Sequence, residues 1–173
     1  MSFQFRPPQE SDLPALAEIF NNEIETSTCT FRTDHVDLSN RRAWLEDIRR
    51  DNYPCLVIVH TIDVDDLSSI VGWCNLSRYR PQEAYSTTTE ITLYIHRDFR
   101  GLGLGSQVIG CIVTEARERG YQTILAMVAT ENAPNTKFWV KCGFEQRGIL
   151  KDVGKKFGRW LDVGVYQLML SSY

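Results

Sequence analysis

Apolar residues recur along the chain at two spacings, one typical of strands and the other of helices. Strands are predicted where β-branched and aromatic residues run together or alternate with polar ones, and helices where apolar residues lie three and four positions apart. The expected strands are 2–6, 55–59, 70–76, 88–95, 123–129, 144–151 and 161–170, and the expected helices are about 12–24, 38–51, 104–119 and 134–142. This order predicts an α/β fold, a three-layer sandwich with a mixed sheet.

Polar and turn-forming residues mark several element ends. Ser11 and Asp12 can cap the first helix, and Gly120 follows the last periodic residue of the third. The acidic segment 63–69 separates two strand-like runs, so we expect it to form the mobile tip of a hairpin.

The composition is that of an ordinary globular domain. The 173 residues are 43% hydrophobic and 24% charged, with a net charge of −3. A chain of this length buries about 70% of its unfolded surface, so we expect one domain over residues 1–173. Lysines and arginines are scattered rather than clustered, which argues against nucleic acid as a partner.

The five cysteines are an odd set, widely spaced and without a C-x-x-C pair. They predict reduced core thiols in a cytoplasmic protein rather than a disulfide framework or a metal site. No basic segment followed by an apolar run opens the chain, and no apolar stretch reaches 18 residues. We therefore expect neither secretion nor membrane insertion.

The segment Arg100-Gly-Leu-Gly-Leu-Gly-Ser106 lies between the 88–95 strand and the 104–119 helix. Backbone N–H groups at a helix start, with the positive end of the helix dipole, favour a phosphate, and glycine allows close approach. The dinucleotide fingerprint G-x-G-x-x-G is absent because Ser106 or Val108 stands at its third glycine, and no P-loop occurs. A glycine-rich turn without a ligand is the alternative.

The pattern Arg-Gly-x-Gly-x-Gly resembles the acetyl-CoA pyrophosphate loop of the GNAT N-acetyltransferases, and the likeness covers nearly the whole chain. It extends to the phosphinothricin and methionine sulfoximine acetyltransferase branch. The matching segments are 20–22, 27–31, 42–44, 53–54, 80–81, 84–85, Glu90 and 154–162, of which Lys156-Phe-Gly-Arg-Trp-Leu-Asp162 is the most distinctive. The resemblance implies a single-domain GNAT-like sandwich with a splayed sheet, acetyl-CoA as cosubstrate without a metal, and a homodimer.

Glu90 is the candidate catalytic base. An amine attacks a thioester only after losing a proton, and at pKa about 8 roughly 10% is free at pH 7. Glu90 stands on the strand that leads into the glycine loop, where a partly buried carboxylate could take the proton through water. A solvated strand-edge residue or an ion-pair partner of a nearby arginine is the alternative, whereas the resemblance points to this same glutamate.

Acetyl-CoA is expected to bind to the backbone of the 88–95 strand and to the glycine loop. Strand residues could receive the pantetheine arm as an added strand would, and one N–H group could polarise the thioester carbonyl. The resemblance adds Asn132 to the pantetheine site, and Arg97 is either a further charge for the phosphates or a solvated turn residue. The predicted cofactor-binding residues are Leu93, Tyr94, Ile95, Arg100, Gly101, Leu102, Gly103, Leu104, Gly105, Ser106 and Asn132.

Arg80 is the candidate clamp for a carboxylate or oxyanion of the acceptor, because its planar fork matches such groups. Arg78 could assist it, Phe31 and Tyr85 either wall the pocket or belong to the core, and Pro81 and Gln82 complete the predicted acceptor site.

Two questions stay open. Lys156, Arg159 and Trp160 could close the site or a dimer edge, and Trp139 stands where related proteins carry a histidine or tyrosine, which leaves the general acid unassigned.

The sequence therefore predicts acetyl-CoA-dependent N-acetylation of a small amino acid or analogue, such as methionine sulfoximine, methionine sulfone or phosphinothricin. A non-catalytic CoA-binding module and an acetyltransferase of protein N-termini are the alternatives. An NAD-dependent oxidoreductase conflicts with Ser106 in place of glycine.

Overall fold

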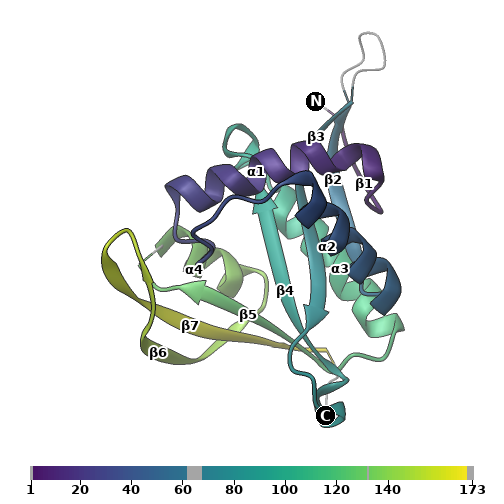
Figure 1. Cartoon of the computed structure of the whole chain (residues 1–173). Helices are drawn as coiled ribbons and strands as arrows, with labels where there is room; N and C mark the ends of the chain where they lie inside the picture. Colours follow the sequence, from purple (N-terminus) through teal and green to yellow (C-terminus); the bar gives the residue numbers. More distant parts are fainter. Residues whose placement is uncertain (1, 62–67, 132, 171–173) are drawn as a thin grey trace.

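The computed structural model describes residues 2–61, 68–131 and 133–170 (Figure 1). Their strands form one seven-stranded sheet in the order β1-β2-β3-β4-β5-β7-β6. The strands are β1 (Ser2–Arg6), β2 (Cys55–Thr61), β3 (Ser68–Arg78), β4 (Thr88–Ile95), β5 (Thr123–Ala129), β6 (Glu145–Lys156) and β7 (Arg159–Met169). All neighbours are antiparallel except β4 and β5, so the sheet is mixed, as predicted.

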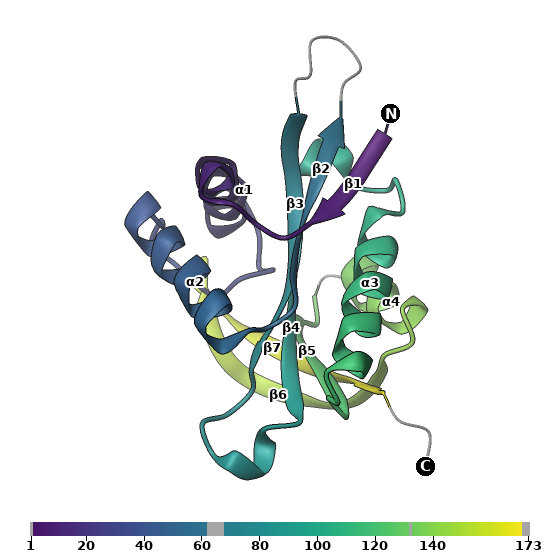
Figure 2. The ribbon, with the colours of Figure 1, turned by 90° about the vertical axis from the view of Figure 1, so that its right-hand side faces the viewer.

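Four α-helices cover the two faces of the sheet (Figure 2). α1 (Leu13–Thr26) and α2 (Leu38–Asp51) lie on one face, and α3 (Leu104–Glu118) and α4 (Ala133–Lys141) lie on the other. Short 3-10 turns occur at Glu10–Asp12, Glu83–Tyr85 and Arg97–Phe99. The predicted three-layer sandwich is confirmed.

Each face of the sheet has its own hydrophobic cluster. One contains the apolar side of α3, including Val108 and Ile112, packed on Ile58 and Ile124. The other joins α1 and α2 to the opposite face, where Trp73 is 1% exposed. Strand residues alternate between the two clusters because successive side chains point to opposite faces.

The last two strands are longer than predicted. β6 and β7 form a hairpin whose tight turn has positive φ at Phe157 (+51°) and Gly158 (+77°), typical of a two-residue turn. The sequence predicted both strands but ended the first at 151 and began the second at 161, because 151–160 is rich in charged residues and β6 is exposed along nearly its whole length.

Asp12 does not cap α1 with its side chain, contrary to expectation. Its carboxylate instead receives two hydrogen bonds of 2.8 Å from Arg6 and one of 2.7 Å from the N–H of Gln9. The predicted mobile hairpin tip, 63–69, falls largely on residues 62–67, outside the described residues.

None of the five cysteines forms a disulfide, but they are not all core residues as predicted. Cys55 and Cys74 are buried, Cys29 and Cys142 are half-buried, and Cys111 on α3 is exposed. Across the described ranges, no helix is long and apolar enough to cross a membrane.

Candidate active site

The site begins where β4 and β5 part. The two parallel strands pair only over Thr88–Glu90 and Thr123–Leu125, although β4 continues to Ile95 and β5 to Ala129. Because β3 and β7 occupy their outer edges, the parted segments leave two backbone edges facing each other. The splay implied by the resemblance is present, and a cavity of about 630 Å³ lies along it.

Most of the predicted donor-site residues line this cavity. The structure brings together Glu90, Leu93, Tyr94, Ile95, Arg100, Gly101, Gly103, Leu104, Gly105 and Ser106. Leu102 is 48% exposed and does not line it. Asn132 lies outside the described residues.

The glycine loop has the geometry of an anion cradle. Gly101 and Gly103 both have φ of +79°, a conformation that favours glycine, and Gly103 directly precedes the first turn of α3. A Cβ on Gly105 would lie 2.9 Å from the Phe138 ring, so this helix position admits no side chain unless the Phe138 ring moves. Free N–H groups at a helix start and small residues fit a pyrophosphate.

Arg100 has a different arrangement from the one expected. Its guanidinium pairs with the carboxylate of Glu23, whose side chain is 4% exposed, and donates to the carbonyl of Ile95 at 2.9 Å. Ser27 donates to the other Glu23 oxygen at 2.7 Å. The cofactor loop is therefore tied to the end of α1 by a buried carboxylate.

β4 presents two different faces to the cavity. Leu93 and Ile95 pack into the cluster under α3, whereas Tyr94 packs with the α1 and α2 cluster. By the alternation of a strand, Glu90 and Thr92 share the face of Tyr94. The backbone edge of β4 can therefore bind one ligand, and the polar side chains of Glu90 and Thr92 can contact a second ligand.

Glu90 is half-buried, and burial raises the pKa of its carboxyl group above the ordinary value. Within the described ranges, no hydrogen bond or ion pair joins this carboxylate to another side chain, so the ion-pair alternative finds no partner there. A carboxylate with a raised pKa and free oxygens is suited to accept a proton.

The predicted acceptor residues lie outside this cavity. Phe31 packs on β6, where a Cβ on Gly154 would overlap its ring. Arg78 donates to the carbonyls of Arg80 and Pro81 and thereby holds its own loop. Arg80 lies over the rings of Tyr79 and Tyr85, 5.1 and 5.6 Å from their centroids, and Pro81, Gln82 and Tyr85 are exposed.

The loop 27–36 closes the site from above and is held at several points. Asn21 exchanges two hydrogen bonds with the backbone of Val36, at 2.8 and 2.9 Å. Lys156, 4% exposed, donates to the carbonyls of Ser27 and Thr30 at 2.7 and 2.8 Å, and burial lowers the pKa of its ammonium group. Lys156 therefore fastens the β6–β7 hairpin to this loop.

Arg159 and Trp160 differ from Lys156. Arg159 pairs with Glu131, which also receives a hydrogen bond of 2.9 Å from Thr28. Trp160 is 62% exposed on the outer side of the hairpin. The Arg159–Glu131 ion pair and the Thr28–Glu131 hydrogen bond together join the hairpin to Thr28, whereas Trp160 faces solvent.

Several cavity residues were missed by the sequence reasoning, among them Thr92, Glu23, Cys29 and Phe138. Thr92 could have been found, because alternation places it on the face of Glu90. Glu23, Cys29 and Phe138 carry no local signal, since they come from the end of α1, the following loop and α4. Trp139 also lines the cavity but is 6% exposed and packs on Phe144, so it is a core side chain.

Comparison with known proteins decides the family. The model of the acetyltransferase (GNAT) domain matches residues 5–165. The chain belongs to the GNAT acetyltransferase family. It is 34% identical, over 98% of its length and 96% of the relative, to an L-methionine sulfoximine/L-methionine sulfone acetyltransferase of Pseudomonas aeruginosa. It is 31% identical to the phosphinothricin N-acetyltransferase of Streptomyces viridochromogenes, over 95% of this chain and 86% of that one.

Solved structures agree on the fold. A Salmonella typhimurium acetyltransferase with its cofactor acetyl-CoA has a TM-score of 0.90 at 28% identity, covering 100% of this chain and 96% of that one. A ribosomal-protein-alanine N-acetyltransferase from Brucella melitensis has a TM-score of 0.87 at 34% identity, covering 96% and 99%. The chain is thus an acetyl-CoA-dependent N-acetyltransferase, and the splayed strands and glycine loop fit this cosubstrate. The described residues contain no group of three or more potential metal ligands.

Proposed function

We propose that this GNAT enzyme acetylates the amino group of a small amino acid or analogue, of the methionine sulfoximine, methionine sulfone or phosphinothricin type, with Glu90 as general base. The single observation that carries the mechanism is the Glu90 carboxylate, which lines the cavity and has no side-chain partner within the described ranges. Relatives similar to this chain are named for such acceptors, and this similarity supports the proposed substrate class.

The proposed reaction is a direct transfer. Glu90 takes a proton from the acceptor ammonium, directly or through one water, and the free nitrogen attacks the thioester carbonyl. A C–N bond forms, the nitrogen gives up its second proton to water, the C–S bond breaks, and the thiolate leaves. A backbone N–H of the free β4 edge, Leu93–Ile95, can stabilise the carbonyl oxygen during the attack.

No general acid is assigned at α4. Trp139 holds this place, and its indole cannot supply a titrating proton. Because CoA thiolate is a good leaving group, the reaction can proceed while the thiolate takes its proton from water.

Acceptor recognition is proposed for the loop between β3 and β4 and for the segment around Phe31. Arg80 is the proposed clamp for an acidic group, since it is exposed and no carboxylate of the described residues pairs with it. Arg78 supports the clamp indirectly by holding the loop that carries it.

A homodimer is proposed through the β6–β7 hairpin. Five large apolar side chains are exposed on this hairpin: Ile149 47%, Leu150 44%, Val153 53%, Phe157 54% and Trp160 62%. Clustered exposed apolar residues mark association surfaces. We also propose the cytoplasm as the location, because the five cysteines form no disulfide.

An amine panel tests the proposed function. Release of CoA from acetyl-CoA is measured with amino acids, their sulfoximine, sulfone and phosphinate analogues, and peptides with a free N-terminus. Turnover of small amino acids above peptides supports the proposal. Turnover of peptides alone would favour a protein N-terminal acetyltransferase, and acetyl-CoA-dependent thermal stabilisation without any amine-dependent CoA release would indicate a binding module.

The dimer has its own test. Light scattering at micromolar concentration is expected to give twice the monomer mass of 19.9 kDa. Trp160→Glu, on the exposed face of β7, is expected to shift the mass toward the monomer, whereas Glu118→Gln on α3 is expected to leave it unchanged. A monomeric wild type would contradict the proposed assembly.

A further inference from the structure

Lys156 on β6 is a buried cation that binds backbone carbonyls rather than an acidic side chain. It is 4% exposed, and across the three described ranges it forms no ion pair. The Glu23 carboxylate, whose charge acts on Lys156, is engaged with another cation. The ammonium group instead donates to the carbonyls of Ser27 and Thr30, at 2.7 and 2.8 Å. Because a buried charge is costly unless it is hydrogen-bonded, these two bonds hold the loop 27–36 against β6.

The two carbonyls that Lys156 holds lie on either side of Cys29, which lines the same cavity as Glu90. Two further contacts fix the backbone of Cys29 itself. Its N–H group donates to the Ser27 hydroxyl at 3.2 Å, and its carbonyl accepts from the Tyr94 hydroxyl at 3.4 Å. The place of the Cys29 side chain in the cavity therefore depends on β6 from one direction and on β4 from the other.

The strand that carries Lys156 is shaped to receive this loop. Gly154 and Lys156 are alternate residues of β6, so they share a face of the strand. A Cβ on Gly154 would overlap the Phe31 ring, and the missing side chain lets the loop lie against the strand. Arg159, which is opposite Lys156 in the hairpin, reaches the same loop through Glu131. This face of the hairpin thus holds the loop at several points.

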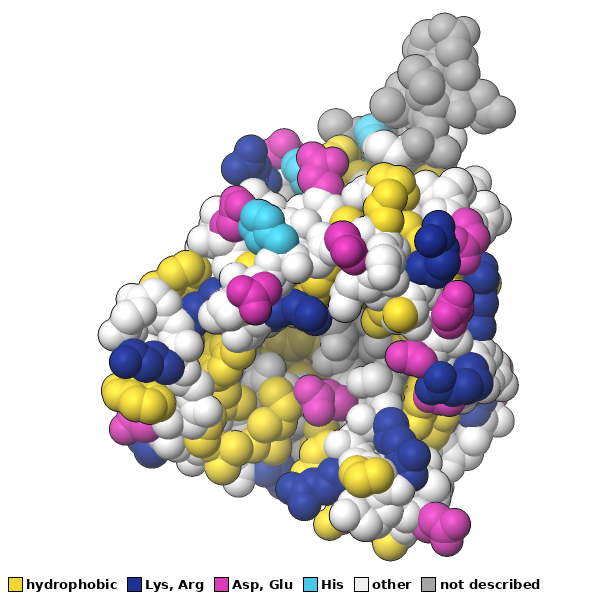
Figure 3. Space-filling model, in the orientation of Figure 1, with side chains coloured by type: hydrophobic (Ala, Val, Ile, Leu, Met, Phe, Trp, Pro, Cys, Tyr) yellow, Lys and Arg dark blue, Asp and Glu magenta, His cyan; other side chains and the backbone are white. Residues whose placement is uncertain are grey.

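The fastened loop limits the room around the reacting amine. The space-filling view shows a hollow lined largely by hydrophobic side chains, with an acidic group inside it (Figure 3). Cys29 and Glu90 line one cavity of about 630 Å³, in which acetyl-CoA must also fit. A free amino acid places only small substituents beside its amine, whereas a peptide continues as a chain. A wall held in place at Cys29 therefore discriminates between these two kinds of acceptor.

We propose that Lys156 is a positioning residue that holds Cys29 at the wall of the cavity and thereby makes the enzyme favour free amino acids over peptide N-termini. Lys156 itself does not contact the acceptor in this proposal and acts through the loop that it binds. The inference rests on the proposed function and deepens it by naming the residues that set the size of the acceptor.

The test compares L-methionine sulfone with a tripeptide that begins with the same residue, in wild type and in Lys156→Met. The wild type is expected to prefer the free amino acid in kcat/KM. Lys156→Met is expected to raise KM for the amino acid about 10-fold, the effect of losing a charged hydrogen bond, without lowering kcat/KM for the tripeptide. The preference should therefore fall about 10-fold, while kcat and acetyl-CoA affinity change little because Glu90 and the glycine loop are untouched.

Two further variants separate positioning from folding. Tyr94→Phe removes the other bond to Cys29 without leaving a buried charge, and it is expected to change the preference in the same direction by about 2- to 10-fold. Cys29→Ala removes the side chain on which Lys156 is proposed to act. In the Cys29→Ala background, Lys156→Met is expected to change KM less than it does in wild type.

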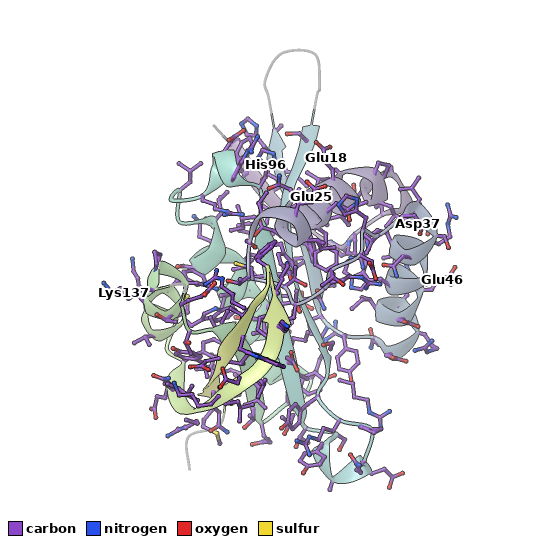
Figure 4. All side chains as sticks on the ribbon, turned by 60° about the vertical axis from the view of Figure 1, so that its left-hand side comes forward. Glu18, Glu25, Asp37, Glu46, His96 and Lys137 are labelled. Carbon is purple, nitrogen blue, oxygen red and sulfur yellow. The ribbon has the colours of Figure 1, made fainter. Side chains whose placement is uncertain are left out.

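Lys137→Met is the matched control. Figure 4 labels Lys137, which points outward from α4, is exposed and does not line the cavity. This variant makes the same substitution at a place without contact to the loop 27–36. Its KM values and its preference are expected to equal those of wild type.

Each outcome supports or overturns a different statement. If Lys156→Met and Tyr94→Phe both keep the full preference of wild type, the inference is wrong while the proposed function stands. If Lys156→Met loses turnover of both acceptors equally, together with acetyl-CoA affinity and melting temperature, Lys156 is only structural and the inference is again wrong. Strictly additive effects of Lys156→Met and Cys29→Ala on KM would also overturn it. If wild type acetylates the tripeptide but not the amino acid, the proposed function itself fails.

Discussion

The donor side and the acceptor side of β4 are built in different ways. The donor side consists of the free strand edge beyond Glu90 and the loop 100–106, so it is largely backbone from one continuous segment. The proposed acceptor side collects side chains from β4, the loop 27–36 and the loop between β3 and β4. In this proposal one side binds through N–H groups that nearly every residue possesses, and the other through particular charges.

This difference explains which changes each side tolerates. Backbone binding depends on conformation, so glycines and strand geometry must be kept while most side chains can vary. Side-chain binding depends on a few charged groups, so acceptor preference can change without loss of acetyl-CoA binding. The predictions below separate the two sides, beginning with the group between them.

Glu90→Gln is expected to have the largest effect, a fall in kcat of about 10²- to 10⁴-fold, because the amide keeps the shape but cannot accept the ammonium proton. Acetyl-CoA affinity, measured by titration calorimetry, is expected to be unchanged. Glu118→Gln, an exposed change at the end of α3, serves as the control for charge. Wild-type kcat in Glu90→Gln at neutral pH would make Glu90 structural.

The pH profile sharpens this test. Burial raises the pKa of Glu90 above its ordinary value, so the carboxyl group is protonated up to a higher pH than a solvated glutamate. The acid limb of kcat is therefore expected above the ordinary glutamate pKa, and Glu90→Gln is expected to lose this limb and to regain rate only at high pH. The raised pKa also means that ionisation of Glu90 costs stability as pH rises, so Glu90→Gln should be at least as stable as wild type at neutral pH.

Gly103→Leu is expected to weaken acetyl-CoA binding by about 10- to 100-fold, the effect of losing charged backbone hydrogen bonds. Gly120→Leu is the matched control, since Gly120 follows the other end of α3 with φ of +77° against +79° for Gly103. Both variants carry the same backbone strain and should lose similar stability. Equal acetyl-CoA affinity in the two would remove the loop from the site.

The difference between the donor side and the acceptor side also determines how much of the site the sequence could predict. The glycine loop, its strand and its helix are contiguous, so the motif and the family resemblance together predicted residues that line one cavity, including Gly103 and Gly105. Glu23 was not found, because its place in the site depends on its burial and on its ion pair with Arg100, which lies 77 residues away in the sequence. Arg78 was assigned to the acceptor from residue type, but its guanidinium binds its own loop.

Arg100→Gln tests the link between the two sides. It leaves the buried Glu23 carboxylate without its cation, so we expect a loss of about 1–3 kcal/mol in the free energy of unfolding at neutral pH. Adding Glu23→Gln is expected to recover part of this loss, which a double-mutant cycle with chemical denaturation would measure. Strictly additive effects of the two substitutions would show that the pair does not act as a unit.

Arg80→Ala is expected to give the smallest effect and the most selective one. Arg80 is exposed and stacked on Tyr79 and Tyr85, so solvent screens its charge, and we expect KM for the acceptor to rise only about 3- to 10-fold. The rise should be larger for acceptors with an oxygen-rich far end, such as a sulfone or phosphinate, than for methionine. Arg42→Ala, which removes an exposed arginine of α2 that is paired with Glu10, should leave KM unchanged. An unchanged KM for every acceptor in Arg80→Ala would remove Arg80 from the acceptor site.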